Sequence, residues 1–278
     1  MSWFEKLHVF ILLGALSGCV PIIDLLKMSN AEADEVRKEQ SLKIASVSEA
    51  VGNYAAAIDV YLNLLSKDPA NEELLFMLGN SYSKAGAKRN AADVFEQLEK
   101  LDPTNKETQL ALGSINLSLY RPEIAKVYFE NALRLAPFDF MALSGLGITE
   151  DMAGNHETAR LLYGDALKSS PDKTIIINNI ALSYLMEGKY NMSIQMLSDI
   201  AFDDGVNQII RQNLALAYGL AGDWQAAKRT SSLHLDPDAI ATNLRYYDLL
   251  RQMNDTVAFR RLLLGTKGQE VSQFEGSR

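Results

Sequence analysis

Small apolar residues recur along the chain at a fixed spacing. Four prolines stand 34 residues apart (103−69, 137−103 and 171−137), and we number each repeat so that its proline is position 32. Position 8 is small throughout and reads Ala45, Gly79, Gly113, Gly147, Ala181 and Ala215. Position 20 is small as well and reads Ala57, Ala91, Ala125, Ala159, Ser193 and Ala227. These columns predict two helices that pack too closely for a branched side chain between them.

Two further columns follow the same period. Position 24 is mostly large and fills the predicted joint to the next repeat, with Tyr61, Phe95, Phe129, Tyr163, Leu197 and Ser231. Position 15 is Gly52, Gly86, Gly154, Gly188 and Gly222, with Tyr120 as the exception. A glycine there suits the left-handed residue that ends a helix. Pro122, two residues past Tyr120, suits the first turn of a second helix.

A 34-residue period is the signature of tetratricopeptide (TPR) repeats, which are helix–turn–helix units that stack on one another. The sequence therefore predicts an all-α fold, a TPR superhelical solenoid of about six repeats over residues 38–237. The pattern weakens late in the chain, where Gly205 replaces a proline and Pro237 comes early (237−171 is 66, not 68). Residues 238–264 predict a C-terminal capping helix pair, Ile240–Met253 and Thr256–Leu264, and residues 265–278 a flexible tail.

The N-terminal segment predicts export and lipid attachment. Lys6 precedes an apolar run from Val9 to Leu16, which is short for a membrane span. The following Leu16-Ser17-Gly18-Cys19 resembles the bacterial lipobox, which implies a signal peptide over residues 1–18 and a lipid on Cys19. Residues 19–37 would then be the lipid anchor and tether, helical from about Asn30. The alternative is an uncleaved signal anchor, since apolar residues continue to Ile23.

The lipobox also implies a location. Val20 is not the aspartate that retains lipoproteins in the inner membrane of enteric bacteria. We therefore expect an outer-membrane lipoprotein that faces the periplasm. The net charge of −8 argues against a nucleic-acid partner and against electrostatic binding to anionic lipid, so the membrane attachment would rest on the lipid.

The sequence nominates no catalytic or metal site. The three histidines, His8, His156 and His234, have no second ligand at metal spacing, and phosphate-loop and dinucleotide motifs are missing. Asp203-Asp204-Gly205 lacks the alternating oxygen ligands of a calcium loop and reads as a turn. We expect a protein that is not an enzyme, with no cofactor besides the covalent lipid and no small-molecule substrate.

The repeat register selects a candidate partner surface. In TPR stacks, first-helix positions 2, 5, 9, 12 and 13 face the concave groove, and here they turn apolar and methionine-rich through repeats 4 to 6. Exposed apolar surface of this kind marks interaction sites, and methionine adapts to varied partners. The predicted groove residues, with the asparagines of positions 5 and 6, are Leu117, Met141, Ile148, Met152, Ile175, Asn178, Asn179, Leu182, Leu185, Met186, Ile209, Asn213, Leu216 and Leu220.

Two interpretations of this surface remain open. It binds a partner segment, in which case a charge at Met152 or Leu182 abolishes capture and leaves melting unchanged. Alternatively, it is covered internally, because the C-terminal helices around Tyr246 and Leu250 fold back into it or because the superhelix closes on itself. The same choice applies to Asn179 and Asn213, which stand 34 residues apart (213−179) at position 6. They hold the backbone of an extended peptide, or they make hydrogen bonds between helices.

A closer resemblance rests on three segments. Asn178-Asn179-Ile180-Ala181-Leu182-Ser183-Tyr184, Arg211-Gln212-Asn213-Leu214-Ala215 and Asn243-Leu244-Arg245-Tyr246-Tyr247 are similar to the TPR lipoprotein family of Tad (Flp) pilus assembly, TadD. The resemblance implies a pilotin-like lipoprotein that helps a secretin ring to assemble or localise, and it transfers no catalytic residues. A type IV pilotin-like protein, or an adaptor for outer-membrane assembly or peptidoglycan enzymes, is the alternative.

Overall fold

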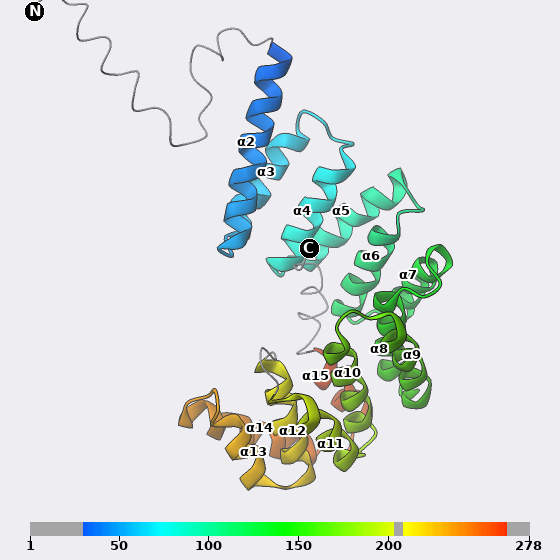
Figure 1. Cartoon of the computed structure of the whole chain (residues 1–278), viewed down its shortest axis with the longest axis vertical. Coiled ribbons are helices and arrows are strands. Elements are labelled where there is room, and N and C mark those ends of the chain that lie inside the picture. Colours follow the sequence, from blue (N-terminus) through cyan, green and yellow to red (C-terminus); the bar gives the residue numbers. More distant parts are fainter. Residues whose placement is uncertain (1–29, 203–207, 266–278) are drawn as a thin grey trace, which may run out of the picture. The chain divides into compact units, whose positions relative to one another are not determined.

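The computed structural model describes residues 30–202 and 208–265, and every element within them is a helix (Figure 1). The described residues divide into two compact units, with the boundary between Pro69 and Ala70. In the first unit α2 (Asn30–Ala50) packs against α3 (Tyr54–Leu65). The second unit holds α4 (Glu72–Lys84), α5 (Lys88–Leu101), α6 (Lys106–Ser118), α7 (Pro122–Leu135), α8 (Phe140–Ala153), α9 (His156–Ser169), α10 (Lys173–Met186), α11 (Tyr190–Ile200), α12 (Gln208–Ala221), α13 (Trp224–Ser231), α14 (Pro237–Arg251) and α15 (Thr256–Gly265). The all-α solenoid with a C-terminal helix pair that the sequence predicts is what the structure shows.

Each repeat is a pair of helices, called A and B in chain order. In the second unit the A helices are α4, α6, α8, α10 and α12, and each packs along the B helix that follows it. Each proline of the repeat stands one or two residues before the N-cap of the next A helix. Asn71, Asn105 and Asp139 each accept a hydrogen bond from a backbone N–H of the first turn, at 3.1, 2.9 and 3.0 Å.

The residue that ends each A helix lies in the left-handed region, as position 15 predicts. The glycines have φ between 75° at Gly52 and 89° at Gly154. Tyr120 occupies the same position with φ 58° and is the one residue other than glycine with positive φ in the described part of the chain. This backbone conformation lets the chain reverse within two residues, so the B helix starts at once.

The small and large columns meet in space. A methyl group built on Gly113 would lie 2.6 Å from Phe129 Cε1, and one on Gly147 would lie 2.4 Å from Tyr163 Cε1. Phe129 also touches the next A helix, since a methyl on Gly145 would lie 2.4 Å from its ring. Phe129 therefore fills both the space within its own repeat and the joint to the following one, and the joint is the part that the sequence predicts.

The last two helices behave differently from each other. α14 packs against α12 and α13 and so continues the stack as a further A helix would. Its Tyr247 takes the space beside Gly219 of α12, where a methyl would lie 2.6 Å from the ring. α15 does not pack along α14 as a B helix would. It lies against α8 and α10 instead (Figure 1).

Candidate functional site

The structure describes all fourteen predicted groove residues and exposes none of them. The partly buried ones are Met141, Ile148, Met152, Ile175, Asn179 and Ile209. The buried ones are Leu117, Asn178, Leu182, Leu185, Met186, Asn213, Leu216 and Leu220. Positions 2, 5, 9, 12 and 13 of α4, α6, α8, α10 and α12 are called the A-helix surface below. Cys19 and the segment before it lie outside the described residues.

Coverage of the A-helix surface rises along the stack. In α4 and α6, Glu73 and Glu107 are exposed and Ser83 and Ser114 are partly buried. In α10 and α12, positions 9, 12 and 13 are all buried. The surface therefore carries exposed acids early in the second unit, although Leu110 and Leu117 of α6 are already buried, and it is covered and apolar late in the unit.

Burial changes what a charge at Leu182 would do. Leu182 is only 4% exposed and belongs to one hydrophobic cluster with Leu185, Leu216 and Leu263. An ionised side chain there would lose its hydration without a partner. A Leu182 charge would therefore lower the melting temperature, and the expectation of unchanged melting is wrong for this residue. Met152 is only partly buried.

The C-terminal helix α15 supplies part of this cover. Leu263 is 4% exposed, and Phe259 packs against the cluster that contains Leu182 and Leu185. Val257, on the same helix, is 62% exposed. One side of the helix thus lies on α8 and α10, while its other side also carries exposed apolar residues.

Three arginines of the last two helices lie against the residues that end A helices. A methyl on Gly154, which ends α8, would lie 3.2 Å from Arg260 Cζ, and one on Gly222, which ends α12, 3.4 Å from an Arg251 nitrogen. Arg261 stacks on the ring of Tyr120, which ends α6, with Cζ 4.7 Å from the centroid. A cation is favoured there because the last carbonyls of a helix carry partial negative charge.

Asparagines join neighbouring A helices in a repeated pattern. Asn179 donates to Ser144 Oγ at 3.1 Å, and Asn213 donates to Asn178 Oδ1 at 2.6 Å. In both pairs position 6 of one repeat donates to position 5 of the preceding repeat. We call Ser144, Asn178, Asn179 and Asn213 the asparagine ladder. Of the two sequence interpretations, the structure shows hydrogen bonds between helices.

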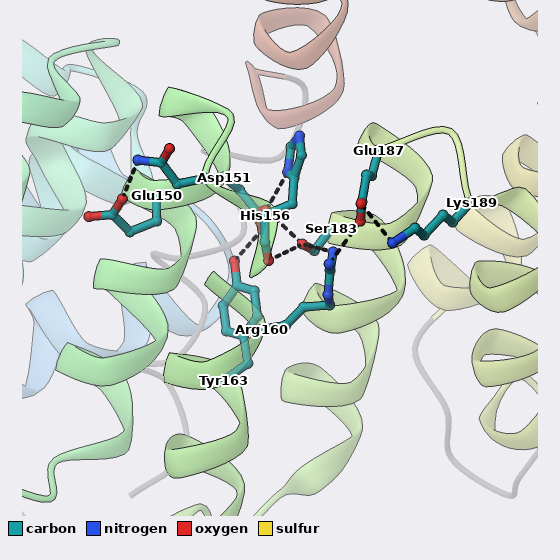
Figure 2. Close-up of polar contacts among 9 residues, drawn as sticks. Glu150, Asp151, His156, Arg160, Tyr163, Ser183, Glu187 and Lys189 are labelled. Carbon is teal, nitrogen blue, oxygen red and sulfur yellow. Dashed lines mark hydrogen bonds and ion pairs between the residues drawn. The ribbon is translucent and has the colours of Figure 1, made fainter. Parts of the chain in front are cut away.

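A buried carboxylate connects three helices at one end of α8. Asp151 is 0% exposed and accepts hydrogen bonds from Ser183 Oγ at 2.7 Å and Tyr163 Oη at 2.9 Å. His156 Nδ1 lies 2.8 Å from Asp151 Oδ1 (Figure 2). Burial raises the pKa of Asp151, while the hydrogen bonds from these three partners act in the opposite direction.

The network extends to the surface through Arg160. Its guanidinium donates to Ser183 Oγ, pairs with Glu187 at 2.8 Å and lies over the Tyr184 ring at 4.3 Å. Glu187 also pairs with Lys189 at 2.7 Å (Figure 2). The hydrogen bond from Lys189, with the charge of Arg160, holds the pKa of Glu187 below its usual value.

This arrangement contains serine, histidine and aspartate, but its hydrogen bonds do not connect them in the order serine, histidine, aspartate that nucleophilic catalysis needs. A serine is activated when the imidazole accepts its proton, and the aspartate orients that imidazole. Here Ser183 donates to Asp151, accepts from Arg160, and lies 3.4 Å from the backbone oxygen of His156, so it makes no hydrogen bond with the imidazole. The described residues bring together no cluster of three metal-ligating side chains, and no helix among them is long and apolar enough to cross a bilayer.

Comparison with known proteins agrees with this architecture. The tetratricopeptide repeat family matches residues 42–106 and 110–174. The chain folds as a TPR protein. No curated protein matches it.

Solved structures show the same fold at low sequence identity. A TPR protein from Parabacteroides merdae ATCC 43184 is 17% identical with a TM-score of 0.68, over 78% of this chain and 86% of that one. PilW, titled a widely conserved type IV pilus biogenesis factor, is 17% identical with a TM-score of 0.63, over 75% and 97%. A thermophilic TPR protein of Thermus thermophilus is 20% identical with a TM-score of 0.57, over 65% and 98%.

Two features of the TPR stack escaped the sequence reasoning. Asp151 stands at position 12, where the neighbouring repeats have Leu117 and Leu185, and an acid in an apolar column is a signal for a buried carboxylate. Arg260 and Arg261 carry no such signal, because their contacts with Gly154 and Tyr120 depend on where α15 lies.

Proposed function

We propose that this TPR protein is a membrane-tethered adaptor that holds a segment of a protein partner on its A-helix surface during assembly of a Tad-type pilus machine. A TPR fold is in general a scaffold for protein interaction. The observation that carries the proposal is that α15 lies on α8 and α10. The A-helix surface therefore has a shape that accommodates a helix. The same surface continues along α4 and α6, where Glu73 and Glu107 are exposed.

The tether in this proposal is the lipid on Cys19. Leu16-Ser17-Gly18-Cys19 and the residue that follows support an outer-membrane lipoprotein that faces the periplasm. Bacterial lipoprotein cysteines carry two or three acyl chains, and stable anchoring takes at least two. Tethering confines the repeats to a thin layer and raises the effective concentration for any partner at the same membrane.

Two observations support a pilus machine as the setting of this adaptor. The segments around Asn179, Asn213 and Tyr246 are similar to the TadD family, and PilW, whose title names pilus biogenesis, shares the fold. The partner would then be a secretin or another assembly component, as for a pilotin. A type IV pilotin-like role, or an adaptor for outer-membrane assembly or peptidoglycan enzymes, is the alternative that the experiment separates.

Photo-crosslinking in cells tests the proposal. A photo-reactive residue at Ser114, which is partly buried on the A-helix surface of α6, is expected to give an adduct with a secretin or another pilus-assembly protein. The matched control is Leu161 on α9, which is 69% exposed and off the A-helix surface. An adduct with barrel-assembly or peptidoglycan-hydrolase subunits would favour the alternative. Equal labelling from both positions, or labelling from Leu161 alone, would refute a partner site on the A helices.

A further inference from the structure

α15 has the properties of a bound ligand rather than of a repeat helix. Every other B helix of the second unit packs along the A helix before it, but α15 departs from α14 and lies against α8 and α10. It spans only Thr256–Gly265, so it is short for a helix that persists alone. Its position therefore depends on its contacts with the A-helix surface.

Those contacts are of two kinds. Phe259 and Leu263, one helical turn apart, enter the hydrophobic cluster that includes Leu182 and Leu185. Arg260 and Arg261 lie on Gly154 and Tyr120, where α8 and α6 end. The apolar pair at i and i+4 thus packs on the apolar cluster of the A-helix surface. The two adjacent arginines lie on the ends of two of its helices.

The fit of α15 is incomplete, which leaves room for a competitor. Arg260 Nε is buried without a hydrogen-bond partner, and no carboxylate in the described residues pairs with either arginine. Val257 and Leu262 are 62% and 40% exposed. A buried donor without an acceptor is a cost that the folded state carries. A longer helix could keep the good contacts of α15 and add others on α4 and α6, where Glu73 and Glu107 are exposed.

We infer that α15 is an internal occupant of the partner site, and that the partner segment is a basic amphipathic helix of the same pattern that displaces it. This deepens the proposed function and rests on it. The partner helix carries an aromatic and an aliphatic residue at i and i+4 on one side, with arginine or lysine beside them. Its basic residues suit the helix ends at Gly154 and Tyr120, the exposed acids of the early repeats, and the net charge of −8.

A labelled peptide of residues 254–265 added to the mature full-length chain is the probe. In the wild type the attached copy of α15 competes at a high effective concentration, so we expect weak binding. Phe259→Ala with Leu263→Ala in the chain weakens the attached copy and leaves α8 and α10 unchanged. We expect the peptide to bind this variant at least tenfold more tightly, measured by fluorescence anisotropy.

Controls separate displacement from unfolding and from adhesion. Val257→Ala in the chain alters an exposed residue of the same helix and is expected to leave peptide affinity as in the wild type. Arg261→Ala removes the contact with the Tyr120 ring and so weakens α15, and it should increase peptide binding if the Phe259 variant loses its folded melting transition. A peptide that carries Arg260→Glu and Arg261→Glu should not bind. A photo-reactive group at peptide position 259 should label α8 or α10.

The outcomes are decisive in both directions. Tighter binding to both weakened chains, with labelling of α8 or α10, supports the displaceable occupant. Equal affinity for wild-type and weakened chains, or no saturable binding to either weakened chain, shows that α15 is a fixed structural cap. That result leaves the adaptor proposal standing, because crosslinking from Ser114 tests it without reference to α15.

Discussion

At the scale of single residues, Gly147 and Gly164 show how different two helical glycines can be. A methyl on Gly147 would lie 2.4 Å from the Tyr163 ring, whereas one on Gly164 would meet nothing within 4 Å. Tyr163 cannot move aside easily, because it is buried and bonded to Asp151. We expect Gly147→Ala to destabilise the fold by about 1–3 kcal/mol. Gly164→Ala should instead stabilise it by about 0.5–1 kcal/mol.

Chemical denaturation of the two variants checks this pair. The free energy of unfolding is expected to fall in Gly147→Ala and to rise in Gly164→Ala. Because both variants make the same glycine-to-alanine change in a helix, each serves as the control for the other. Similar stability for Gly147→Ala and the wild type would mean that the ring at position 24 is mobile, and the close packing of columns 8 and 24 would lose its physical reason.

Asp151 predicts a pH dependence with a defined sign. Because its pKa is raised, the folded chain binds a proton there more readily than the unfolded chain does. The contribution of this residue to stability is therefore gained as the pH falls and lost as it rises through the raised pKa. We expect the free energy of unfolding of the wild type, minus that of Asp151→Asn, to increase as the pH falls from about 7 toward that pKa.

Urea unfolding at a series of pH values gives this difference directly. Titrating groups that do not touch Asp151, such as Glu187 with its lowered pKa, are present in both proteins and cancel to first order. His156 contacts Asp151, so the comparison is made in a His156→Gln background. A difference that shrinks on acidification would show that the hydrogen bonds to Asp151 outweigh its burial and that its pKa is lowered.

The conformation and packing of residues at repeated positions were predictable from the sequence. The surroundings of a residue that breaks the repeat pattern, such as Asp151, were not. The left-handed residues at Gly154 and Gly222, and the contact between Gly147 and Tyr163, follow from local geometry that the period repeats. The burial of Asp151 depends on three partners that come from α9 and α10. Position alone placed Asp151 on the partner surface and could not show that its charge is enclosed.

At the scale of helices, the asparagine ladder makes a prediction about paired changes. Asn178→Leu leaves the buried donor of Asn213 without its acceptor, which we expect to cost about 1–3 kcal/mol. Asn178→Leu with Asn213→Leu removes both partners and should recover much of that loss. A double-mutant cycle by thermal or chemical unfolding measures the coupling. Additive losses would mean that the two amides act independently, as peptide-binding groups would.

The helices themselves were largely predictable, but the place of α15 was not. The N-caps Asn71, Asn105 and Asp139 and the residues that end A helices mark helix boundaries in the sequence. The pattern of Phe259 and Leu263 says that one side of α15 is buried, and it does not say against what. Several apolar surfaces could accept such a helix, and the energy that chooses α8 and α10 arises from tertiary contacts.

At the scale of the whole molecule, the proposed lipid on Cys19 would decide where the repeats work. We expect Cys19→Ala to move the protein from the membrane fraction to a soluble or unprocessed form, because the remaining attachment would be marginal. Fractionation with detergent partitioning, together with the intact mass of the purified chain, measures this. A variant that stays in the detergent phase at its unprocessed mass would favour the uncleaved signal anchor instead.

The asparagine ladder gives the stack an order that packing alone does not. Each rung needs an acceptor at position 5 of one repeat and an asparagine at position 6 of the next. If repeats 3 and 4 were exchanged, Asn179 would face Leu110 instead of Ser144. Repeat 5 carries both halves, Asn178 and Asn179, so a tandem copy of it would meet a matching rung at the new joint. A chain of this kind can lengthen by duplication at repeat 5, whereas an exchange that separates repeat 5 from repeat 4 or from repeat 6 leaves the amide of Asn179 or Asn213 without its partner.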